Sequence, residues 1–144
     1  MKNKTREIAD TPEKGKKRYN LYKAVIDRYL KARECGFYLE AITLMESLIT
    51  DRLESLLIYY NLLSPEEAFM TLGPCINKIR SEQGLLSDCL IEELDTWRKA
   101  RNQSLHEIAK IKEGDSAVFN QRYSDLKSIA IKGYVLFKAI KAET

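Results

Sequence analysis

The spacing of apolar residues is the feature that most restricts what this chain can fold into. Bulky apolar side chains recur at steps of three and four, which is the period of an α-helix with one buried face. Four long segments have this pattern: residues 19–34, 37–60, 87–112 and 116–142. No segment has the alternating pattern of a half-buried strand. We therefore expect an all-α fold, an antiparallel up-and-down bundle of four long helices.

The second segment and the connector after it add detail to this expectation. Residues 37–60 have the longest and broadest apolar face, so this helix should be central. Residues 61–84 should form a connector with short extra helices. Ser64 followed by Pro65 is typical of a helix start, and the dipeptide at positions 73 and 74, Gly-Pro, is expected to end that short helix.

Charge is distributed unevenly along the chain. Residues 1–18 contain seven basic and three acidic side chains, a net charge of +4, and lack apolar periodicity. We expect them to form a mobile basic arm, with a single helical domain over 19–144. Because the whole chain has a net charge of +3, the remainder is close to −1. Such a domain does not have the broad basic surface that grips duplex DNA.

The cysteines and the hydropathy pattern indicate the compartment. Cys35, Cys75 and Cys89 are an odd number, widely spaced, without a CxxC pair. This spacing argues against a disulfide framework or a zinc site and favours a reducing cytosol. No stretch has the apolar length of a membrane span, and the N-terminus lacks the apolar core of a signal peptide. We expect a cytoplasmic protein with no membrane partner, no metal and no cofactor.

An arginine interrupts the apolar stripe of the third long segment. The apolar members of this stripe are Leu90, Leu94, Trp97, Leu105 and Ile108. The same spacing includes position 101, so Arg101 should point toward the interior or an interface. An inward arginine is costly unless it is paired or faces a wet cleft. Glu46 lies among the apolar rows of the second segment and is a candidate partner, whereas Asp51 is expected to form surface pairs with Arg52.

The only histidine of the chain follows on the same predicted helix. Arg98, Asn102 and His106 are spaced four apart, so they share one flank of the helix. Arg101 and His106 are five apart, which separates them by about 140° around the axis and about 7.5 Å along it. One helix cannot easily direct both groups at one small target. Two copies crossing antiparallel can, and the spacing therefore favours a composite site on a homodimer.

These residues resemble a known family. The pattern Arg101-Asn102-x-x-x-His106, in a late long helix, resembles the R-x4–6-H motif of the HEPN superfamily of helical proteins, and the resemblance extends over about residues 19–142. It implies a metal-independent endoribonuclease that acts as a dimer, with the RNA's 2′-OH attacking the adjacent phosphate. His106 would accept the proton, Arg101 would stabilise the phosphorane, and Asn102 would orient the histidine or bind a phosphate oxygen. Glu46 and Arg98 would have supporting roles.

The resemblance also implies partners, and it leaves alternatives open. RNA would be the substrate, and an antitoxin or a nucleotidyltransferase-type protein would be the partner in a toxin–antitoxin or phage-defence pair. Alternatively, the chain is a non-catalytic HEPN-like module that binds a partner protein or a nucleotide, with Arg101 serving packing or the dimer contact. A third alternative is a structural helical scaffold. In each case Trp97 is expected to anchor the core.

Overall fold

The computed structural model describes residues 4–111, 113, 114 and 118–144, and these are helical or loop throughout, without a strand. The expected all-α bundle is therefore confirmed. Within this part of the chain, no helix is long and apolar enough to cross a membrane. The elements are α1 (Pro12–Glu34), α2 (Tyr38–Tyr59), the short 3₁₀ turn η1 (Pro65–Glu67), α3 (Leu72–Ser81), α4 (Asp88–Glu107) and α5 (Phe119–Glu143).

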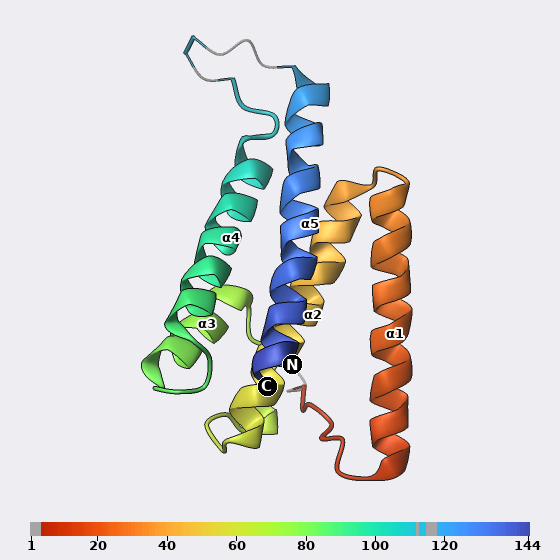
Figure 1. The fold of residues 1–144 in the computed structure, drawn as a ribbon, viewed down its shortest axis with the longest axis vertical. Coiled ribbons are helices and arrows are strands. Elements are labelled where there is room, and N and C mark those ends of the chain that lie inside the picture. Colours follow the sequence, from red (N-terminus) through yellow and green to blue (C-terminus); the bar gives the residue numbers. More distant parts are fainter. Residues whose placement is uncertain (1–3, 112, 115–117) are drawn as a thin grey trace.

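The four long helices run alternately up and down (Figure 1). Helix α2 packs against α1 on one side and α5 on the other, and α4 packs against α5. The shorter α3 lies against both α2 and α4, where it covers the lower part of that side of the bundle. Because α2 contacts α1, α3 and α5, it is the central helix that its broad apolar face predicted.

The core contains two large side chains, a tyrosine and a tryptophan, whose polar groups donate hydrogen bonds to backbone carbonyls of α5. The Tyr29 hydroxyl, on α1, donates to the carbonyl of Ala130 at 2.6 Å, and the Trp97 indole N–H, on α4, donates to the carbonyl of Ile129 at 2.8 Å. A glycine lets Trp97 approach α5 closely, because a Cβ on Gly133 would lie only 2.9 Å from the indole. Trp97 is 3% exposed, as expected of a core anchor.

We expected a mobile arm over residues 1–18, and its predicted end at residue 18 is wrong. Helix α1 begins at Pro12, and the Thr11 side chain caps it by accepting a hydrogen bond from the Lys14 N–H. Proline suits the first helical position because the amide that it lacks would have no helical partner there. Capping therefore starts the helix before the apolar periodicity begins. Residues 1–3 lie outside the described part of the chain.

The segment before α1 is bound to α2 rather than mobile. The Arg6 guanidinium forms ion pairs with Asp51 at 2.9 Å and Glu54 at 3.1 Å. The backbone N–H of Arg6 donates a hydrogen bond to the carbonyl of Pro65. Asp51 also accepts from Arg18, on α1. The expectation that Asp51 forms surface pairs with its neighbour Arg52 is thus wrong, because its partners come from the N-terminal segment and α1.

The connector between α2 and α4 also differs from the expected pattern. Only residues 65–67 form a short turn, and α3 then begins at Leu72 with Gly73 and Pro74 in its first turn. The first turn of a helix leaves its N–H groups unpaired, so a proline there costs no hydrogen bond. The Gly-Pro pair therefore opens a helix where we expected it to close one.

Helix α4 ends at Glu107, earlier than the expected end at Lys112, which lies outside the described residues. Its end is held by α5, because the Arg122 guanidinium donates to the carbonyls of Glu107 and Ile108 at 2.6 and 3.3 Å. Satisfying these terminal carbonyls from another helix lets the chain turn away. The expected start of the last helix, at Ser116, is also outside the described residues, and α5 begins at Phe119.

Candidate functional site

Arg101 lies on α4 at a half-buried position facing α2. One guanidinium nitrogen forms an ion pair with Glu46 of α2, and another donates to the Asn102 side-chain oxygen. The Nε atom is buried and has no hydrogen-bond partner among the described residues. The Arg101 side chain is 23% exposed, so it is neither a core residue nor a free surface charge. The expected contact with Glu46 is present.

Glu46 is a carboxyl that gains a proton more easily than usual. Burial against α4 raises its pKa, and the charge of Arg101 opposes this effect without cancelling it. The pair thus places a guanidinium and a partly buried carboxylate in direct contact between α4 and α2.

A hollow of about 410 Å³ opens beside Glu46, between α2 and residues 69–72. Three hydroxyl side chains of α2, those of Thr43, Ser47 and Thr50, contribute to its wall. Such a polar space next to the Arg101–Glu46 pair has room for part of a polar ligand.

His106 lies in the last turn of α4 and is exposed. It forms no hydrogen bond or ion pair with any residue in the described part of the chain, so both ring nitrogens are accessible to a ligand. The structure thus brings Arg101, Asn102 and Glu46 together, but no described contact joins His106 to them. This separation agrees with the angle of about 140° that five helical residues impose.

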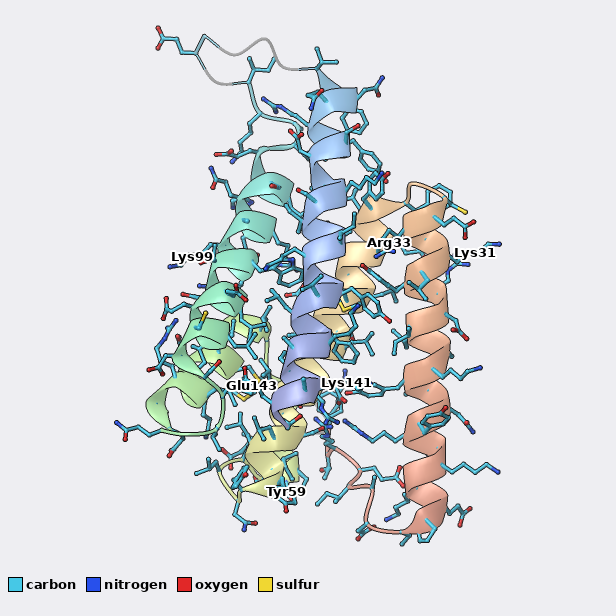
Figure 2. All side chains as sticks on the ribbon, in the orientation of Figure 1. Lys31, Arg33, Tyr59, Lys99, Lys141 and Glu143 are labelled. Carbon is cyan, nitrogen blue, oxygen red and sulfur yellow. The ribbon has the colours of Figure 1, made fainter. Side chains whose placement is uncertain are left out.

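Arg98 belongs to a different cluster, centred on Asp95. Its guanidinium donates twice to one Asp95 oxygen, at 3.0 and 2.8 Å, while Arg80 and Lys99 approach the other oxygen at 3.3 Å each. Lys99 points away from the bundle (Figure 2). Sequence reasoning missed Asp95, although its position three and four residues before two basic residues is a signal for helical ion pairs.

The Asp95 cluster predicts a specific loss of stability in acid. Its hydrogen bonds with Arg98, and then with Arg80 and Lys99, lower the pKa of Asp95 from 3.8 to about 2. A lowered pKa means that this stabilisation is complete above pH 3.8 and is lost as the pH falls toward 2. Because Arg80 and Lys99 extend into solvent, we expect it to be at most about 2 kcal/mol.

Urea unfolding between pH 6 and 2 measures this contribution. In Asp95→Asn, the free energy of unfolding should fall less steeply with acid than in the wild-type protein. Glu93→Gln is the matched control, because Glu93 lies on the same helix, is about half exposed and, among the described residues, forms an ion pair only with Lys132, at 3.8 Å. An unchanged acid dependence in Asp95→Asn would contradict the assignment.

Metal-ligating and nucleophilic side chains are scattered. Within residues 4–111, 113, 114 and 118–144, no three His, Cys, Asp or Glu side chains gather in a way that could hold a metal ion. Cys35 and Cys89 are exposed, and burial raises the pKa of the Cys75 thiol to about 12. This buried thiol is therefore a poor nucleophile near neutral pH.

Comparisons with known proteins found no relative of this chain. No protein-family model matches the chain, and neither a curated protein nor a solved structure was found to be similar to it.

Proposed function

We propose that this protein is a metal-independent endoribonuclease of the HEPN type that acts as a homodimer. The observation that carries this proposal is the position of Arg101. It is a half-buried arginine in an apolar stripe, held by Glu46 and Asn102, on the same helix as the exposed His106. Cationic and titratable groups of this kind are what cleavage of an RNA phosphodiester requires.

The proposed reaction uses the substrate's own nucleophile. His106 accepts the proton of a ribose 2′-OH, the O2′–P bond forms, and the P–O5′ bond breaks. The departing 5′-oxygen takes a proton from water, which leaves a 2′,3′-cyclic phosphate and a 5′-hydroxyl. Arg101 stabilises the negative charge on the phosphorane through its planar guanidinium, and Asn102 orients that group.

Binding of RNA would exchange the anion that pairs with Arg101, from the Glu46 carboxylate to a phosphate of the RNA. In the free protein the guanidinium is paired with Glu46. A phosphate at the site would compete with Glu46 for the same guanidinium nitrogens. Glu46 would thus keep Arg101 in position until RNA binds.

Helical geometry is the reason for proposing two copies. His106 and Arg101 of one helix point about 140° apart, so a second α4 must bring its histidine to the first arginine. Light scattering at micromolar concentration should therefore give the mass of a dimer. A ribonuclease of this kind in a cytoplasm would also need restraint, which an antitoxin of a toxin–antitoxin or phage-defence pair would provide.

The test is incubation of the purified protein with mixed RNA, and with DNA of the same sequences, in excess EDTA. RNA should be cleaved and DNA spared, because DNA lacks the 2′-OH. Mass spectrometry should find 2′,3′-cyclic phosphate and 5′-hydroxyl ends. Arg101→Ala and His106→Ala should each reduce the rate at least about 100-fold. Gln103→Ala, an exposed position on the same helix, is the matched control and should remain active. Products with a 5′-phosphate, or undiminished cleavage in both site variants, would overturn the mechanism.

A second candidate is favoured by the same ion pair. Because Arg101 is already bound to Glu46, it can serve as a tie between α4 and α2 in a non-catalytic module that binds a partner protein or a nucleotide. In that case the wild-type protein would cleave none of many RNAs, and Arg101→Ala would lower thermal stability without changing any activity.

A further inference from the structure

A second hollow, of about 370 Å³, lies on the other side of the molecule from α4, between α1, α2 and the C-terminal end of α5. Figure 2 shows Lys141 near the end of α5, beside this region. Four of the described lining residues are basic and none is acidic. The lining residues that bear on binding are Arg18, Tyr19, Tyr22, Lys23, Arg52 and Lys141.

Two of the four positive charges form no ion pair with an acidic side chain in the described part of the chain. Arg18 is paired with Asp51 at 2.6 Å, and Lys23 lies 3.9 Å from Asp27. In contrast, no described carboxylate lies within ion-pair distance of the other two cations. Arg52 donates to the Thr144 hydroxyl at 3.0 Å, and the Lys141 ammonium lies 5.6 Å from the centre of the Phe137 ring.

This arrangement concentrates uncompensated positive charge in one concave place. Like charges that line one hollow repel each other, and a bound anion relieves this repulsion. A guanidinium and an ammonium on neighbouring helices also offer several hydrogen-bond donors to a group with several oxygens, such as a phosphate.

Aromatic side chains form the rest of the wall. Tyr19 is 66% exposed, so one face of its ring is free to stack on a planar group. Tyr22 is fixed in place, because the Arg18 guanidinium lies 4.7 Å from its ring centre and its hydroxyl donates to Asp51. Free cations beside an exposed ring are the combination with which proteins hold single-stranded nucleic acid and nucleotides.

We propose that this hollow binds a nucleotide through its phosphate and its base. Arg52 and Lys141 contact the phosphate, and Tyr19 stacks on the base. The volume of about 370 Å³ is in the range of small-molecule sites. The ligand is either a free nucleotide or one unit of a single-stranded RNA, since both present the same chemistry. The site is separate from Arg101 and His106 and does not require that they cleave RNA.

Binding is measured by calorimetry with three probes: AMP, inorganic phosphate and a 2′-O-methyl oligonucleotide, which resists attack by a 2′-OH. The double variant Arg52→Gln/Lys141→Gln should bind AMP and the oligonucleotide at least about 10-fold more weakly, because each lost phosphate contact removes part of the electrostatic free energy. Lys127→Gln, an exposed position on α5 outside the hollow, is the matched control and should bind normally. Circular dichroism verifies that each variant is folded.

Tyr19→Ala separates base stacking from phosphate binding. It should weaken binding of AMP and leave binding of inorganic phosphate unchanged. Tighter binding of the oligonucleotide than of AMP identifies an RNA strand as the ligand, and equal binding identifies a free nucleotide. The binding measurements require no RNA cleavage, so this inference and the proposed cleavage can fail independently. Failure of the wild-type protein to bind any probe at millimolar concentration, or equal binding by the double variant, would overturn the proposal.

Discussion

Trp97→Ala is expected to lower the free energy of unfolding by about 3–5 kcal/mol. The indole is 3% exposed, donates to the carbonyl of Ile129 and lies against Gly133. Alanine at this position removes the packing of the indole against Gly133 of α5 and leaves a cavity between the two helices. Urea unfolding followed by circular dichroism at 222 nm gives the difference.

The control for this prediction is His106→Ala on the same helix. The His106 side chain is exposed and forms no hydrogen bond or ion pair with the described residues, so its loss should change the free energy of unfolding by less than about 0.5 kcal/mol. If His106→Ala destabilises the protein as much as Trp97→Ala does, the histidine is structural and its proposed role is wrong.

Glu54→Ala is expected to destabilise the protein by about 3–5 kcal/mol, because it removes a buried carboxylate that pairs with a buried cation and accepts two backbone N–H groups. Glu54 is 4% exposed and Arg6, which it contacts, has a side chain that is 10% exposed. The same carboxylate accepts the backbone N–H groups of Phe69 and Met70 at 3.2 and 2.7 Å. Phe69 has a φ of 68°, a conformation that costs a bulky residue energy and that these hydrogen bonds hold in place.

A second variant at this position separates charge from hydrogen bonding, and a variant elsewhere, in the connector, serves as the control. Glu54→Gln keeps an acceptor oxygen and loses the charge, so its effect should be smaller than that of Glu54→Ala. Glu66→Ala removes an exposed glutamate of the connector and should be nearly neutral. A free energy of unfolding for Glu54→Ala within 0.5 kcal/mol of the wild type would show that Arg6 and Glu54 do not stabilise the fold.

The periodicity of the sequence predicted the helices well where apolar burial decides the structure. The starts of α2 and α4 fall within one residue of their expected positions, and both contribute many core side chains. The start of α1 could not be predicted in the same way, because the turn from Pro12 onward depends on capping by Thr11 and carries few apolar residues. A local polar composition does not distinguish a free arm from an exposed helical turn.

The contact between the two charged residues of the candidate site was predictable because each of them interrupts the apolar face of its own helix. Arg101 and Glu46 both stand among apolar residues of their own helices, and this indicated that they could meet. Asp51 gave no such signal, because Arg6 and Arg18 reach it from 45 and 33 residues away. Contacts of this range depend on how the helices are placed in space, and one helix's pattern does not contain that information.

The two hydrogen bonds from Tyr29 and Trp97 to α5 determine how far the helices can slide along one another. Helices that meet only through apolar side chains can shift by one turn, about 5.4 Å, and still bury similar surfaces. The two donors end on neighbouring carbonyls, those of Ala130 and Ile129, and a shifted helix would miss its acceptor. Arg101 follows Trp97 by one turn, so the indole also sets the height of the guanidinium. In this way a core tryptophan fixes the level along α5 at which Arg101 stands.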